Sequence, residues 1–148
     1  MTDTISNAIA RLQDIALACT TITIKSAPDY PLENAEPTPF VIAHMQSGDI
    51  IASNKTMLKP IVMVNSDFYF SAVNLKQAYQ QMDLLIMEYS KRLAGDPTLN
   101  GTVTTIILGE DRHPTFENLG IGKWGTIDLQ LLRFSIPIKS LETPQSTP

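Results

Sequence analysis

The polar side chains best placed to do chemistry lie in one segment, which also holds the only tryptophan. They are Glu110, Asp111, His113 and Glu117. Carboxylate and imidazole groups together could bind a divalent cation. Their spacing follows no metal-site pattern, and the only other histidine, His44, is far away in the sequence. A solvated loop explains the cluster as well, so we predict no metal site.

Residues 120–125 (GIGKWG) have the letters of the dinucleotide-binding fingerprint. That site needs a strand before the glycines and a helix after them, so that the helix N-terminus meets the pyrophosphate. Here we expect a loop before the segment and an alternating strand after it. The sequence therefore predicts no nucleotide site.

Residues for nucleophilic catalysis are equally scarce. The single cysteine, Cys19, lies on the apolar side of the first expected helix, where a buried and unreactive thiol is the rule. No Gly-x-Ser-x-Gly elbow occurs, and two histidines leave little choice of general base. We expect no catalytic residue and no cofactor, and we predict that the chain is not an enzyme.

The charge balance narrows the choice of partners. Fifteen acidic and eleven basic residues give a net charge of −4, which argues against a surface built to hold nucleic acid. Charged residues make up 18%, below the roughly 25% of average domains, which is typical of a surface partly committed to partners. The N-terminus does not resemble a signal peptide and no apolar run approaches membrane-spanning length, so we expect no membrane partner and a reducing compartment.

Hydrophobic periodicity predicts the elements that must position these residues. The second helix is the clearest, because its apolar stripe runs from Leu75 to Leu93 and Asn74 provides a plausible N-cap. The other expected elements are a helix at 4–18, a strand at 20–25, a proline-rich loop at 26–39, a strand at 40–45 that turns into a second at 50–53, strands at 61–70 and 103–108, a long loop at 109–125, and a strand at 126–138.

Helices and strands in this irregular order predict an α+β fold. We expect a single, mostly antiparallel or mixed sheet of about five strands with two helices packed on it. Residues 1–139 would form this one domain, and residues 140–148 a flexible C-terminal tail. The apolar alternation changes phase near Leu131-Leu132, which predicts a β-bulge or a switch of the covered face.

One segment resembles small phage proteins of the tail-terminator and neck type. In those proteins a long helix closes with Asp-Pro-Thr-Leu, and Gly-Thr-Val then leads into a strand; here residues 96–103 read DPTLNGTV. The order of other features is also similar: a Tyr-Pro loop at residues 30–31, a Pro-Phe-Val strand start at 39–41, and an alternating final strand at 132–138. The resemblance covers most of residues 5–138.

The resemblance implies a structural role in the virion. Tail terminators form a ring, typically a hexamer, at the head-proximal end of the tail tube, where they stop tube growth and join the neck. The implied partners are further copies of this chain, the tail tube protein and a neck or connector protein, with DNA only as passing cargo. Assembly would take place in the host cytoplasm.

A closed ring needs two different patches on each subunit. We expect these patches in the two long loops and on the second helix, away from its stripe. The candidate interface residues are Tyr30, Leu32, Leu84, Met87, Phe116 and Trp124. Two alternatives stay open: a neck, adaptor or tail-completion protein, and a small ligand- or metal-binding domain that uses the 110–124 loop.

Overall fold

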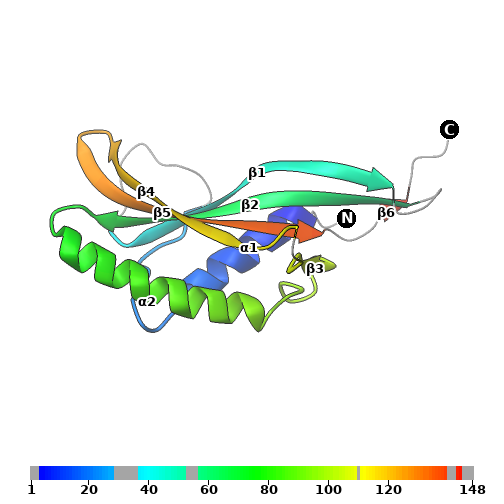
Figure 1. Ribbon diagram of the computed structural model, residues 1–148, viewed down its shortest axis with the longest axis horizontal. Coiled ribbons are helices and arrows are strands. Elements are labelled where there is room, and N and C mark those ends of the chain that lie inside the picture. The colour runs from blue at the N-terminus through cyan, green and yellow to red at the C-terminus, as the bar shows by residue number, and fades with distance from the viewer. Residues whose placement is uncertain (1–3, 29–36, 53–56, 110, 140–142, 145–148) are drawn as a thin grey trace.

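Two helices lie on one side of an antiparallel sheet in the computed structural model, which describes residues 4–28, 37–52, 57–109, 111–139 and 143–144 (Figure 1). The sheet has the order β1-β2-β5-β3, and β4 also pairs with β5 while β6 pairs with β2. The predicted α+β fold is therefore confirmed. The elements are α1 (Thr4–Leu17), β1 (Phe40–Ala52), β2 (Met57–Ser71), α2 (Leu75–Ala94), β3 (Thr105–Ile106), β4 (Thr115–Trp124), β5 (Ile127–Lys139) and β6 (Thr143–Pro144).

The central pair of strands, β2 and β5, runs in one uninterrupted antiparallel register from Ile61 opposite Lys139 to Ser71 opposite Leu129. Alternate side chains of a strand point to opposite faces. The even-numbered residues of both strands therefore face the helices, and the odd-numbered ones face away from them. We call this second side the open face.

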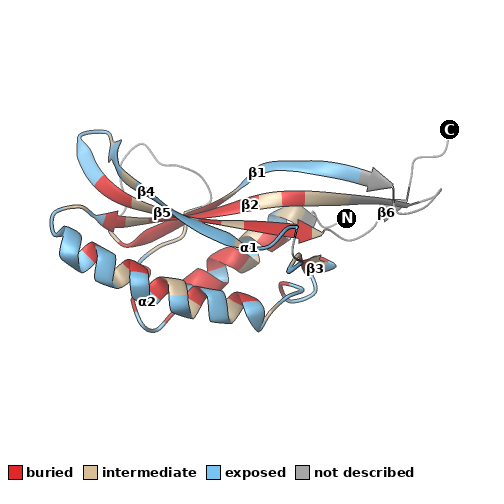
Figure 2. Cartoon of the chain, viewed as in Figure 1, coloured by how far each residue is buried: buried red, intermediate tan, exposed pale blue. Residues whose placement is uncertain are grey.

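The main core fills the space between the helices and the sheet (Figure 2). At its centre, the rings of Phe68, Tyr89 and Phe134 meet edge to face, with centroids 4.7 to 5.5 Å apart. The buried Tyr89 hydroxyl lies 2.9 Å from the Ser66 hydroxyl, which satisfies both polar groups. These contacts fix α2 against the two central strands.

Helix α2 follows its sequence pattern over most of its length. Asn74 Oδ1 accepts a hydrogen bond from the Gln77 amide at 3.2 Å, so the predicted N-cap is confirmed. Leu75 and Tyr79, which belong to the predicted stripe, are 36% and 49% exposed. The buried stripe is therefore narrower than predicted at this end. Its members are Ala78, Met82, Leu85, Tyr89 and Leu93.

The segment predicted as a strand at residues 20–25 forms no strand of the sheet. Residues 20–22 are a bend, and the chain meets β1 only at its end, where the Lys25 amide donates to the Pro39 carbonyl and Ser26 bridges to Phe40. Its alternation is real, since Ile22 and Ile24 enter the main core between exposed threonines. The amides of Thr20 and Thr21 donate to the Glu88 carboxylate of α2 at 2.7 to 2.9 Å. The strand prediction was wrong because this helix side chain, and not a neighbouring strand, takes those backbone donors.

Glu88 accepts more than backbone hydrogen bonds. Its carboxylate also receives the Thr21 hydroxyl at 2.7 Å and the Arg92 guanidinium at 2.8 Å. Burial alone would raise the pKa of Glu88, but the hydrogen bonds from Thr21, Thr20 and Arg92 outweigh it and lower the pKa to about 2. The ionised carboxylate thus ties the end of α1 to α2.

Strand β1 is one long strand where two strands and a turn were predicted. Residue 46 is the extra residue of a bulge between Met45, opposite Val64, and Ser47, opposite Met63. Gly48, expected in a turn, instead lies so close to β2 that a Cβ would come within 2.6 Å of the Ile61 carbonyl oxygen. The glycine marks a close approach of two backbones.

The long loop predicted at residues 109–125 is also corrected, because most of it is strand β4. This strand forms a hairpin with β5, with Trp124 opposite Ile127 and Gly125 at a φ of 65° in the turn. Two glycines, Gly120 and Gly122, and several polar residues hid the strand pattern. A loop of that length inside a compact domain was itself a sign of a missed element.

The apolar alternation changes phase near Leu131-Leu132 because the covered face of the sheet changes there. This was one of the two alternatives that the sequence predicted. Leu129 belongs to a small cluster on the open face, whereas Leu132 belongs to the main core. The register of β4 also shifts there, between Asn118 and Gly120.

Two further corrections concern the ends of the sheet. Only Thr105–Ile106 of the strand predicted at 103–108 pairs, with Lys139 and Ile138. Thr143–Pro144, inside the predicted tail, pair with Met57 and Leu58. The other residues of that tail lie outside the described ones.

Replacing Glu88 by glutamine tests the tie between α1 and α2. A folded-state pKa below the ordinary 4.5 means that Glu88 stabilises the fold above that pH and loses this contribution as the pH falls from 4.5 toward 2. We expect E88Q to lower the free energy of unfolding at pH 7 by about 1–2 kcal/mol. The difference from wild type should shrink toward pH 2, as measured by urea denaturation across pH. The control is D83N, an exposed carboxylate on the same helix; equal losses in both variants would contradict the assignment.

Candidate interaction surfaces

The outer side of α2 carries two neighbouring exposed apolar residues, Leu84 and Met87. Leu84 is 48% exposed and Met87 72%, so both predicted interface residues lie at the surface. We call this pair the α2 ridge. A hollow of about 580 Å³ borders it, lined by Thr20, Thr21, Leu84, Met87, Glu88, Lys91 and Arg92. Five of its seven lining residues are polar or charged, although more of the exposed lining surface is apolar than polar.

Phe116, the third predicted interface residue with a free surface, is 56% exposed on β4. It stands opposite Phe134 on the helix side of the sheet, and the two rings lie 6.1 Å apart. A hollow of about 170 Å³ opens beside it, which we call the Phe116 hollow. Its lining residues are Ser90, Leu93, Ala94, Leu108, Pro114, Thr115, Phe116 and Phe134. Apolar side chains form most of this lining.

The α2 ridge and the Phe116 hollow are neighbours along one helix. Successive residues of an α-helix are about 100° apart, so Ser90 and Ala94, which line the hollow, lie about 60° and about 20° from Met87 around the α2 axis. Leu84 lies about 120° from Ser90. The exposed side of α2 therefore presents two different apolar features.

Trp124 has a more structural position than the sequence suggested. Its indole packs on the open face against Phe40 and Tyr69, with ring centroids 5.5 and 5.1 Å apart and nearly perpendicular planes. Together with Ile42 and Leu129 these rings form a second, small core. Burial raises the pKa of Tyr69 to about 12, in keeping with its place in this cluster. The indole, which is half-buried, thus belongs to an intramolecular cluster.

Tyr30 and Leu32, the two candidate interface residues of the proline-rich loop, lie outside the described residues. Their predicted role therefore stays a prediction.

A charged network crosses the open face. The Asp67 side chain, only 3% exposed, accepts two hydrogen bonds from the Arg133 guanidinium at 2.7 and 3.0 Å. His44 Nε2 lies 2.9 Å from Asp67 Oδ2. Next to this group, the Ser135 hydroxyl donates to Asn65 Oδ1 at 3.0 Å. The bidentate ion pair neutralises a carboxylate that the sheet largely removes from water.

The sequence did not single out this network. Asn65 and Asp67 sit in an otherwise apolar strand, and Arg133 and Ser135 alternate with core residues of the final strand. One carboxylate and one guanidinium at positions of the two strands that lie between core residues were the available signal. Their pairing became visible only with the β2–β5 register, which sequence alone did not provide.

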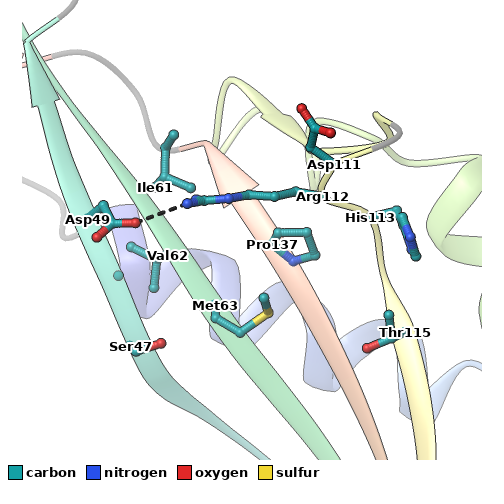
Figure 3. A pocket seen from close by; sticks show the side chains of 11 residues that line it. Ser47, Asp49, Ile61, Val62, Met63, Asp111, Arg112, His113, Thr115 and Pro137 are labelled. Atoms are coloured by element: carbon teal, nitrogen blue, oxygen red, sulfur yellow. Dashed lines mark hydrogen bonds and ion pairs between the residues drawn. The ribbon is translucent and has the colours of Figure 1, made fainter.

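The polar cluster near residue 113 does not form one site. Asp111, Arg112 and His113 border a hollow of about 450 Å³ at one end of the open face. Figure 3 shows Arg112 extending across this hollow to Asp49, with His113 on the other side. The Arg112 guanidinium lies 3.1 Å from Asp49 Oδ2. Glu117 lies elsewhere, on β4, where it stands opposite Arg133 of β5. Among the described residues, which omit Glu110, no group of three or more His, Cys, Asp or Glu could hold a metal ion.

The two remaining chemical motifs can be placed in the fold. Residues 120–125 belong to the β4–β5 hairpin, so no helix follows the glycines and no helix N-terminus is available for a pyrophosphate. Cys19 is buried, and burial together with the Glu88 carboxylate raises the pKa of its thiol to about 11. A thiol held in this protonated form is a poor nucleophile.

Comparison with known proteins adds no relative: no protein-family model matches the sequence, and no curated protein is significantly similar to it. Neither described helix combines the length and apolar character needed to cross a membrane. The interaction surfaces must therefore be interpreted from their own geometry.

Replacing Asp67 by alanine tests the open-face network. The substitution leaves the Arg133 guanidinium without its carboxylate partner, and breaking a mostly buried pair costs about 3 kcal/mol. We expect that loss in the free energy of unfolding by urea denaturation. The matched control is D49A, which removes the exposed pair with Arg112 and should cost less than about 1 kcal/mol. Similar losses for the two variants would contradict the structural role of Asp67.

Proposed function

We propose that this chain is a structural protein of a phage virion, a tail terminator that forms a ring at the head-proximal end of the tail tube. In this role it stops tube growth and provides the joint to the neck. The proposal assigns it no catalytic step and no cofactor. Its partners are further copies of itself, the tail tube protein and a neck or connector protein.

The observation that carries the proposal is the pair of unlike apolar features on α2. A ring subunit contacts its two neighbours through different patches, whereas a twofold dimer uses one patch twice. The α2 ridge and the Phe116 hollow are two such patches, held by one helix. The resemblance of residues 96–103 to tail-terminator proteins supports the same role, since this loop directly follows α2.

The charge of the chain agrees with a position around passing DNA. A net charge of −4 gives the subunit no general attraction for phosphates, so a ring of such subunits would not hold the DNA that moves through it. We place the protein in the assembled tail or neck, after assembly in the host cytoplasm.

Assembly of the purified chain tests the proposal. We expect sedimentation velocity to show a closed oligomer, most simply a hexamer, and negative-stain electron microscopy to show rings. Tubes polymerised from the tail tube protein of the same phage should carry such a ring at one end and stop growing there. A chain that stays monomeric at all concentrations and leaves tube growth unchanged would overturn the proposal.

The neck and adaptor alternative has its own outcome in this experiment. A chain that forms rings on the connector protein, and leaves tube ends free, would belong to the neck instead. Since the same subunit architecture serves both positions, only the choice of partner separates them.

A further inference from the structure

We propose that copies of this chain join edge to edge, with strand β4 of one copy hydrogen-bonded to strand β1 of the next. The proposal rests on the proposed function and adds a backbone contact to the apolar features of α2. The partner at each edge of the sheet is a second copy of this chain, so that the sheet continues from copy to copy around the ring.

Both edges of the sheet are open within the described part of the chain. β1 stands at one end of the strand order, and only the single bridge from Ser26 to Phe40 lies on its outer side. At the other edge, β4 pairs with β5 alone. An edge strand presents a row of backbone N–H and C=O groups with which another extended strand can pair. The chemistry of both edges therefore fits a strand as the partner.

These two edges have few of the features that keep strands apart. Native proteins protect an edge by making it short or by placing lysine or proline on it. β1 has 13 residues with neither lysine nor proline, and β4 has ten without proline and with one lysine, Lys123. Each strand also holds one bulge, which disturbs pairing with a regular strand. Two strands that carry the same irregularity at matching positions can pair in one continuous register.

The directions of the two edges favour a second copy. β1, β2, β5 and β4 are antiparallel to one another in turn, so β1 and β4 run in opposite directions. A rotation about the ring axis that brings β4 of one copy beside β1 of the next therefore makes an antiparallel pair. Each copy offers one edge of each kind, so the contacts propagate in one direction and end when the last copy meets the first.

Exposed apolar side chains lie at matching positions on the two strands. On β1 they are Met45 and Ile50, 57% and 73% exposed, and on β4 they are Phe116 and Ile121, 56% and 53% exposed. The members of each pair are five residues apart with one bulge between them, so both point to the helix side of the sheet. Antiparallel pairing that sets Ile50 opposite Phe116 also sets Met45 opposite Ile121. Such cross-strand pairs stabilise a sheet.

The same register brings two carboxylates together on the open face, where Asp49 of one copy stands opposite Glu117 of the next. Each carboxylate has an arginine of its own copy beside it. Arg112 lies 3.1 Å from Asp49, and Arg133 stands opposite Glu117. Two cations thus flank the two anions, which offsets the repulsion between them.

Hydrogen exchange tests the backbone pairing. We expect the outward-facing amides of residues 44–50 and 115–122 to exchange at least about 10-fold more slowly in assembled protein than in the monomer, because these N–H groups become paired. Mass spectrometry of peptic fragments measures this, and residues 72–74, which belong to neither edge, are the internal control. Rings in which both edges exchange as fast as in the monomer would overturn the proposal.

Disulfide trapping tests the register. Ile50 and Phe116 lie at opposite edges of one copy, so the double variant I50C/F116C can link only different copies. We expect a ladder of linked oligomers under mild oxidation, up to the full ring, on a non-reducing gel. The matched control I50C/I121C moves the second thiol five residues along β4 and should give no ladder. Each single variant should stay monomeric, since Cys19 is buried; dimers from either one would indicate a twofold contact and overturn the proposal.

A charge on the edge measures the strength of the contact. I50K removes the apolar partner of Phe116 and should weaken ring formation about 10- to 100-fold, measured by sedimentation equilibrium. V73K is the matched control, because Val73 is 96% exposed and lies on neither edge. Both variants should unfold at the wild-type temperature, which separates loss of contact from loss of fold. Equal weakening in both would contradict the role of the edge.

The outcomes separate this contact from the proposed function. Wild-type rings that leave the edges unprotected and give no I50C/F116C ladder would overturn the contact and leave the ring intact. Protection of one edge alone, or cross-linking of I50C to the tube protein instead of a second copy, would also overturn it. A wild-type chain that never assembles, alone or on tubes, would overturn both.

Discussion

The register of β2 against β5 is the constraint on which the rest of the structure depends. With Phe68 opposite Leu132, every even-numbered side chain of both strands faces the helices, and Asp67 meets Arg133 on the open face. A slip of β2 by one residue would turn Asp67 into the main core, away from Arg133, and would expose Val64 and Phe68. The ion pair and the apolar core therefore specify the same register from opposite sides of the sheet, so that neither face tolerates an alternative pairing.

Once the register is set, the position of α2 follows from it. Tyr89 packs against Phe68 and Phe134, which belong to the two central strands, while Glu88 on the next flank holds the chain that leaves α1. The helix is thus fixed along two sides, and its remaining surface is free. That surface carries Leu84 and Met87, so a rigid element displays an exposed apolar pair. Apolar groups on a fixed support lose little conformational entropy when they dock, which favours association over local collapse.

Sequence predicted those elements whose local pattern and tertiary role agree. Both helices and the two central strands belong to this group, because a buried stripe or a buried face imposes its period on the residues. Strand β4 escaped prediction because it is an edge strand with most side chains exposed, so no face had to be apolar. The prediction for residues 20–25 was wrong for the opposite reason. Ile22 and Ile24 alternate as in a strand, but the Thr20 and Thr21 amides donate to the Glu88 carboxylate and not to another strand. The candidate surface residues Leu84, Met87 and Phe116 could be found as apolar residues outside a stripe. The Asp67–Arg133 pair could not, since it depends on register.

The low content of charged residues leaves even fewer charges free at the surface than the sequence suggests. Several charged side chains are used within the subunit: Glu88 with Arg92, Asp67 with Arg133, and Arg11 with Asp96. The charged residues of α2 that flank the α2 ridge and take no part in these pairs are Asp83 and Lys91. Copies with the same net charge repel at long range, and this repulsion suppresses unspecific aggregation of the exposed ridge.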